Sequence, residues 1–175
     1  MLKNLRINLA ALLIASVALC GGFISGAVHA GAFTDYFENK LVDWMVRGQA
    51  YTPPASLYLG LDTVACTEAG GGTEVTGGSY ARVAVVSSLA NWAGTQGAGT
   101  TVASSGTSGT TSNNVIATFP APTASWGNVV SFRIWDASTA GNALICQNLT
   151  TAKTINNGDA APSFAAGSLT IQVDN

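Results

Sequence analysis

The chain has 175 residues, of which only 9% are charged, against roughly 25% in an average soluble protein. All nine acidic residues but only five of the seven basic ones follow residue 30, so this part carries a net charge of −4 and lacks the basic surface that nucleic acid requires. A surface with so few charges must consist of small and hydroxyl-bearing residues or lie against neighbouring subunits, which favours an oligomeric shell, fibre or surface-layer protein over a cytosolic enzyme.

The first thirty residues have the pattern of a secretory signal. Lys3 and Arg6 precede a long uncharged stretch, and Val28 and Ala30 supply the small residues that signal peptidase accepts. We predict cleavage after Ala30, which would leave residues 31–175 as one β-rich domain. Two alternatives stay open, because the apolar stretch is long enough for a membrane anchor, and an upstream start codon would add the same residues. We expect membrane contact through this segment alone.

Residues 31–48 are predicted to form the one helix of the domain. Thr34 can cap it with its hydroxyl, Asp35 and Glu38 lie in the first turn, where the helix dipole favours acids, and Gly48 follows the last turn. Apolar residues at helical spacing form one stripe, which consists of Phe37, Leu41, Trp44 and Met45. We expect this stripe to dock on a sheet or a neighbouring subunit, and it is the candidate assembly interface.

Beyond Pro54 the apolar period changes from 3.6 residues to 2. Short runs of alternating apolar residues are separated by turn-forming stretches rich in Gly, Asn and Ser. These runs indicate about six or seven strands and include residues 57–61, 82–85, 115–119, 130–134, 143–149 and 169–173. Short strands without intervening helices predict a mainly β domain, either an antiparallel β-sandwich or barrel-like, behind one N-terminal α-helix.

Residues 94–114 form a tract made mostly of Gly, Ser and Thr. Its one sizeable apolar residue is Val102, so the tract cannot bury enough surface to order itself. We expect either a flexible loop or an extended arm that becomes ordered against a partner.

Without its first thirty residues the chain would contain two cysteines, Cys66 and Cys146. A disulfide between them would close a loop of about eighty residues and stabilise the fold by up to ~4 kcal/mol. Two free buried thiols are the alternative, because the sequence does not show whether the Cα atoms lie within bonding reach.

No group of residues in the sequence is typical of an enzyme site. The single histidine, His29, lies in the signal-like segment, which excludes a Ser/His/Asp or Cys/His arrangement in the rest of the chain. Asp62, Glu68 and Glu74 are close in sequence, but their spacing matches no calcium-binding loop. We predict no catalytic residue, no metal ligand and no cofactor.

Three tryptophans lie near turns or on a strand face, where an aromatic ring can pack against a neighbouring subunit or stack on a sugar. They are Trp92, Trp126 and Trp135. We favour packing between subunits, with contact to a host-surface glycan as the alternative.

Several motifs occur in a specific order along the chain, and they include AFTDYFENKL at 32–41, AYTPPA at 50–55, GGSYARV at 77–83, TFPAPTASWG at 118–127 and LTTAKTINNGD at 149–159. Together they resemble a family of small tailed-bacteriophage proteins known as tail fibre proteins, over residues 32–174. The resemblance implies a non-enzymatic virion protein, a tail fibre or head-decoration subunit whose partners are copies of itself and other virion proteins. The signal-like segment supports an alternative, a secreted or cell-surface filament or adhesin subunit. A carbohydrate-active enzyme is the weakest of the three hypotheses.

Overall fold

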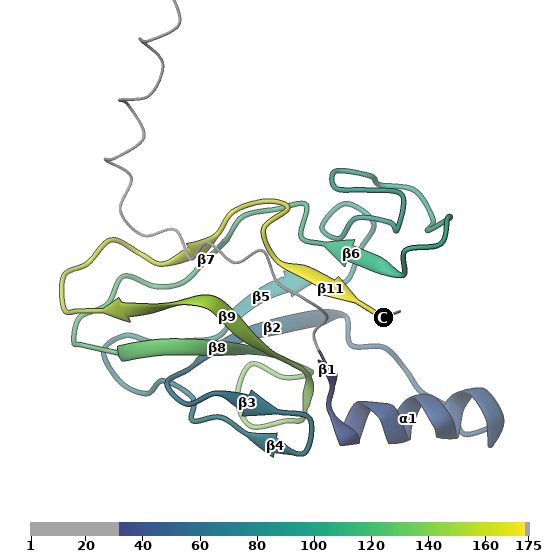
Figure 1. The fold of residues 1–175 in the computed structure, drawn as a ribbon, viewed down its shortest axis with the longest axis horizontal. Coiled ribbons are helices and arrows are strands. Elements are labelled where there is room, and N and C mark those ends of the chain that lie inside the picture. The colour runs from purple at the N-terminus through teal and green to yellow at the C-terminus, as the bar shows by residue number, and fades with distance from the viewer. Residues whose placement is uncertain (1–31, 174–175) are drawn as a thin grey trace, which may run out of the picture.

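A computed structural model describes residues 32–173 of the chain (Figure 1). The predicted signal or anchor, residues 1–30, lies outside this part. Within the described residues, no helix has both the length and the apolar character needed to cross a membrane.

The helix α1 (Asp35–Val46) begins and ends where its capping residues predict. The Thr34 hydroxyl accepts a hydrogen bond from the Phe37 amide at 3.4 Å and donates one to the Ala143 carbonyl at 2.5 Å, which ties the start of the helix to the sheet. Gly48 has a φ of +69°, a conformation that glycine adopts without strain. The predicted start at residue 31 is wrong, because the chain is extended up to the cap and forms the short strand β1 (Ala32–Phe33).

Five antiparallel strands form the main sheet, in the order β1-β9-β8-β2-β5. Its apolar side chains alternate along the strands, so that Leu59 lies opposite Ile134 and Leu61 opposite Phe132 on the face that is buried in the core. The strands beside β1 are β2 (Ser56–Asp62), β5 (Val83–Val86), β8 (Gly127–Trp135) and β9 (Ala143–Ile155).

Short strand pairs complete the fold. The pair of β7 and β10 and the pair of β6 and β11 lie over the core face of the main sheet, while β3 and β4 form a small hairpin on the other side (Figure 1). Their bounds are β3 (Cys66–Thr67), β4 (Gly70–Gly71), β6 (Thr110–Ser112), β7 (Ala117–Thr118), β10 (Ser163–Phe164) and β11 (Thr170–Gln172).

The predicted fold class, antiparallel and mainly β with one N-terminal helix, is confirmed. All six predicted runs contribute to strands, and the others are only two or three residues long. Within residues 32–173 no sheet closes into a barrel, so the barrel alternative is wrong.

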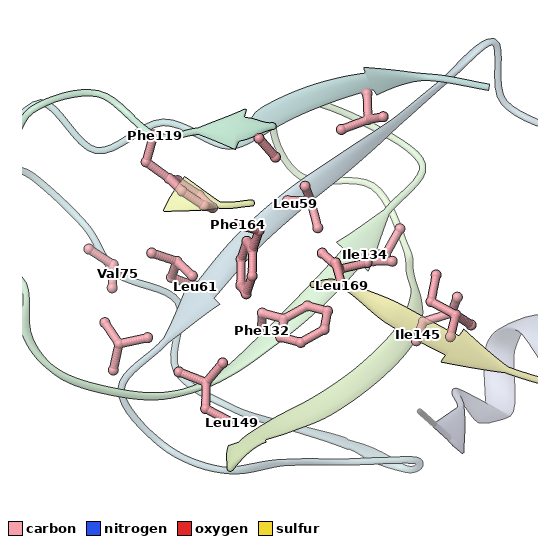
Figure 2. Close-up of a cluster of buried hydrophobic side chains, with 14 of the residues drawn as sticks. Leu59, Leu61, Val75, Phe119, Phe132, Ile134, Ile145, Leu149, Phe164 and Leu169 are labelled. Carbon is pink, nitrogen blue, oxygen red and sulfur yellow. The ribbon is translucent and has the colours of Figure 1, made fainter. Parts of the chain in front are cut away.

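Phe164 joins the two layers through the centre of the core (Figure 2). It is fully buried, and its ring lies 5.2 Å from Phe132 on the main sheet and 6.3 Å from Phe119 beside β7, measured between centroids. Burial of one such side chain stabilises a fold by roughly 1.5–3 kcal/mol. Leu61 and Leu169 fill the space around these rings.

One predicted side-chain alternation is wrong at the start of β8. The sequence pattern places Val130 on the same face as Phe132, but Val129 is the residue that is fully buried, and Val130 is only half-buried. The reason is a register shift between Val129 and Ser131, where β9 contributes extra residues and the period of 2 is interrupted.

The predicted unordered tract is also partly wrong, since residues 110–112 form β6 and pair with β11. The rest of the tract is a loop with its own hydrogen bonds. The Gln96 amide donates to the Ala103 carbonyl at 2.7 Å, and the Thr95 hydroxyl donates to the Ser105 carbonyl at 2.8 Å. Val102 stays exposed, so polar contacts take the place of the apolar burial that the tract lacks.

Candidate functional site

The second half of α1 carries a patch of exposed apolar side chains. The exposed fractions are 52% for Val42, 55% for Trp44, 69% for Met45 and 74% for Val46, and no residue of the helix is buried. We call these four residues the helix patch. A contiguous group of exposed apolar side chains commonly marks a surface that contacts other protein, so the helix patch requires an explanation.

An apolar groove of about 420 Å³ lies between α1 and the sheet. Phe37 lines the groove, and its ring centroid lies 4.9 Å from that of Phe33 and 5.9 Å from that of Tyr51. Six of the residues that line the groove are Phe37, Leu41, Trp44, Tyr51, Pro53 and Leu57. Trp44 belongs to both surfaces, so the helix patch and the groove are continuous.

The predicted stripe therefore divides into two parts. Phe37 and Leu41 are half-buried and face the groove, whereas Trp44 and Met45 are mostly exposed. Val42 and Val46 lie off the stripe, so its helical spacing does not predict them. The run LVDWMV at 41–46 contains a single charged residue, and this composition indicates an apolar surface wider than the stripe.

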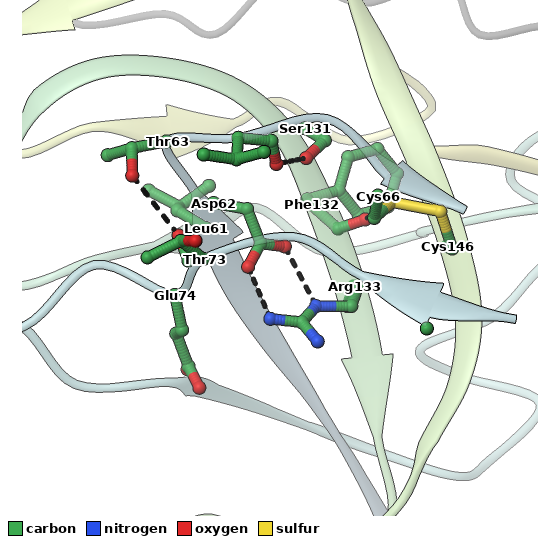
Figure 3. A network of polar contacts seen from close by, with 12 residues as sticks. Leu61, Asp62, Thr63, Cys66, Thr73, Glu74, Ser131, Phe132, Arg133 and Cys146 are labelled. Carbon is green, nitrogen blue, oxygen red and sulfur yellow. Dashed lines mark hydrogen bonds and ion pairs between the residues drawn. A yellow bond between two sulfur atoms is a disulfide. The ribbon is translucent and has the colours of Figure 1, made fainter. Parts of the chain in front are cut away.

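The face of the main sheet opposite the core carries a buried ion pair (Figure 3). The Arg133 guanidinium donates two hydrogen bonds to the Asp62 carboxylate, of 2.9 Å and 2.5 Å, and Asp62 has no exposed surface. Burial raises the pKa of Asp62 above its ordinary value, and the hydrogen bonds and charge of Arg133 oppose this rise without cancelling it.

A second ion pair lies beside the first. The Arg82 guanidinium donates to both carboxylate oxygens of Glu74 at 2.7 Å, and the Tyr80 hydroxyl donates to one of them at 2.9 Å. Burial alone would raise the pKa of Glu74, but the hydrogen bonds from Arg82 and Tyr80 outweigh it and lower the pKa. Burial also raises the pKa of Tyr80 far above its ordinary value.

These contacts leave the acidic residues engaged in structural pairs. Asp62 is paired with Arg133 and Glu74 with Arg82, while Glu68 is exposed on the hairpin. Among the described residues, no three His, Cys, Asp or Glu side chains are grouped closely enough to hold a metal ion.

A disulfide joins Cys66 in β3 to Cys146 in β9 (Figure 3), with the two Cα atoms 5.8 Å apart. Both cysteines are buried. The bond links the hairpin to β9, which lies between β1 and β8 in the main sheet, across 80 residues of sequence.

The three predicted tryptophans have different environments. Trp126 is 4% exposed, and its indole N–H donates to the Gly78 carbonyl at 2.9 Å, so its assignment to a glycan or subunit contact is wrong: the side chain belongs to the core. Trp135 is half-buried under the guanidinium groups of Arg82 and Arg133, which lie 3.7 Å and 4.4 Å from the ring centroid. Trp92 is half-buried and lines a surface hollow of about 410 Å³.

Comparison with known families decides among the functional hypotheses. A family model described as podophage GP4 fiber I protein gp80 matches residues 32–172, nearly all of the part that the structure describes. The chain belongs to this family. It is therefore a phage fibre protein, a structural component of the virion and not a member of an enzyme family. A search of curated proteins found no match.

The family confirms the resemblance that the motifs predict, including its implied location in the virion. Membership also implies contacts with other virion proteins.

Proposed function

We propose that this chain is a fibre subunit that binds its neighbours, copies of itself or other virion proteins, through the helix patch and the adjoining groove. The observation that carries this proposal is the exposure of four large apolar side chains on one half of a helix that is itself unburied. Apolar area removed from water contributes roughly 25 cal/mol per Å², so a partner that covers this surface gains stability.

The shape of the surface supports the same proposal. A projecting helix end and an open apolar groove lie side by side, and an interface between identical or related subunits needs such complementary parts. Charge does not oppose contact there, since the one charged residue in the run 41–46 is Asp43, which pairs with Arg47 at 3.3 Å. Because the matching family is one of fibre proteins, the proposed role of this surface is assembly of a fibre.

The test is the change Trp44→Asp in the full chain, with Ile116→Asp as the matched control. The two side chains are 55% and 56% exposed, and Ile116 lies far along the chain from the helix patch. We expect the parent and the control to sediment as oligomers and the Trp44 variant as a folded monomer. A monomeric parent, or an oligomer that survives Trp44→Asp, would contradict the proposal.

A second candidate is a secreted or cell-surface form of the same fibre domain, as a filament or adhesin subunit. It is favoured by the disulfide between Cys66 and Cys146, since such bonds persist in oxidising compartments. Intact mass of the natural product distinguishes the two. A chain in the culture supernatant that begins at Gly31 supports export, whereas a chain found only in particles supports the virion route.

Trp92 is the remaining candidate for glycan contact. It is half-buried in a surface hollow that also includes Leu89, Ser88 and Ser104, so an aromatic face lies near hydroxyl groups. We expect Trp92→Ala to lower binding of the fibre to host cells without changing its oligomeric state. Unchanged binding would remove this residue from the proposal.

A further inference from the structure

One segment of the chain covers the outer face of the main sheet without a core of its own. Residues 63–73, which we call the cover segment, leave β2 at Asp62, form the β3–β4 hairpin and return beside Glu74 (Figure 3). Its base is closed by a hydrogen bond from the Thr63 amide to the Thr73 carbonyl at 2.8 Å.

Cys66 is the single buried residue of the cover segment, and the other ten are half-buried or exposed. The large apolar residue of the segment, Val64, is 52% exposed. The remaining attachments to the body are polar: the Ser131 hydroxyl donates to the Val64 carbonyl at 2.9 Å, and the Asp35 amide donates to the Glu68 carbonyl at 3.1 Å. The disulfide to Cys146 is therefore the main anchor of the segment.

The hydrophobic core does not include this anchor. The core cluster lies on the opposite face of the sheet, around Phe132 and Phe164, and contains neither cysteine. Beneath the cover segment lies the ion pair of Asp62 and Arg133, and Gly72 passes so close that an added Cβ would lie 3.1 Å from an Asp62 oxygen. The segment thus keeps water from a buried charge pair, while the sheet is held by separate contacts.

We propose that the Cys66–Cys146 disulfide is a redox latch, open while the chain is in a reducing compartment and closed once the protein leaves it. Opening is an exchange with a dithiol: one thiolate attacks a sulfur of the bond, the S–S bond breaks, and the second thiol resolves the mixed disulfide. The protein gains two electrons and two protons, and the dithiol becomes a cyclic disulfide. Closing is the reverse exchange with a disulfide oxidant.

The consequence is a local change in the fibre domain. In the reduced chain the cover segment lifts and water reaches Asp62 and Arg133, but the sheet and its core persist. In the oxidised chain the segment is fixed on the outer face. Release from a reducing cytoplasm therefore suppresses local opening of the cover segment in a domain that has already folded.

Amide hydrogen exchange of the full chain tests this latch, with oxidised protein compared with protein held in dithiothreitol. We expect exchange in peptides that span residues 63–73 to rise at least tenfold on reduction, with protection in β8 unchanged. The variant Cys146→Ala should behave as the reduced protein under both conditions. If β8 also lost protection, the disulfide would be needed by the whole fold. If exchange in the cover segment did not change, the disulfide would not anchor that segment. Either result overturns the latch.

Thiol trapping tests when the latch closes. An alkylating reagent should modify Cys66 and Cys146 when cells are opened before phage release, and neither of these two residues in released particles. The same oxidation state in both samples would overturn the proposed timing.

Discussion

The buried ion pair provides the sharpest test of how the outer face is built. The change Arg133→Met removes the charge but keeps a side chain of similar length, and it leaves the Asp62 carboxylate without its two hydrogen bonds in a site with no exposed surface. Removal of one partner of a buried pair typically costs about 3–5 kcal/mol. Loss of the guanidinium contact with Trp135 adds roughly 0.5–1 kcal/mol.

The sign of the pH dependence follows from the direction of the pKa shift. The pKa of Asp62 is already raised by burial, and removal of Arg133 raises it further, so the folded variant holds the proton more tightly than the unfolded chain. Protonated Asp62 therefore favours the folded variant below the ordinary pKa of an aspartate. This stabilisation is lost as the pH rises through the pKa of Asp62 in the folded variant. The deficit, by which we mean the free energy of unfolding of the parent minus that of the variant, should therefore be smallest at pH 4 and largest near pH 7.

Urea unfolding of both proteins at several pH values measures the deficit. The double variant Asp62→Leu with Arg133→Met should recover most of the loss, because neither charge is then buried alone. A deficit below about 1 kcal/mol at pH 7, or one that does not shrink on acidification, would show that water or another group replaces Arg133 and would refute the reasoning.

Three further predictions concern single side chains. Phe164→Ala should cost about 3–5 kcal/mol in urea unfolding, because its ring joins the two layers, whereas Ile116→Ala on the surface should change stability by less than about 0.5 kcal/mol; equal effects would contradict the core assignment. The free energy of unfolding of the parent should fall as the pH rises above 10, because Tyr80 ionises in the unfolded chain and not in the folded chain. The variant Tyr80→Phe should show a weaker pH dependence. An unchanged pH dependence would show that other groups cause it. Gly60→Ala should lower the melting temperature, because its Cβ would lie 2.8 Å from a Glu74 oxygen and 2.9 Å from the Trp135 indole nitrogen; an unaltered melting temperature would show that these side chains can move aside.

Sequence patterns predicted those features that depend on neighbouring residues. The cap at Thr34, the end of α1 near Gly48 and the strand containing Leu59 and Leu61 all follow from local hydrogen bonding and side-chain period. The family motifs likewise indicated a virion protein, as the match over residues 32–172 confirms.

The patterns could not predict which partner each side chain would meet. Trp126 follows a run of turn-forming residues, yet it packs in the core, where the carbonyl of Gly78, 48 residues earlier, accepts its indole N–H. The register shift at Val130 arises from extra residues in β9, a strand that the pattern alone cannot align.

Local sequence patterns thus suffice to predict the mainly β class, the helix that follows Thr34 and its apolar residues, since these depend on periods and caps that span only a few residues. Long-range packing sets the bond between Cys66 and Cys146, the pairing of Asp62 with Arg133 and the exposure of Trp44. Each of these depends on how elements distant in sequence are placed against one another, and that placement is set by packing of the whole core rather than by any one segment.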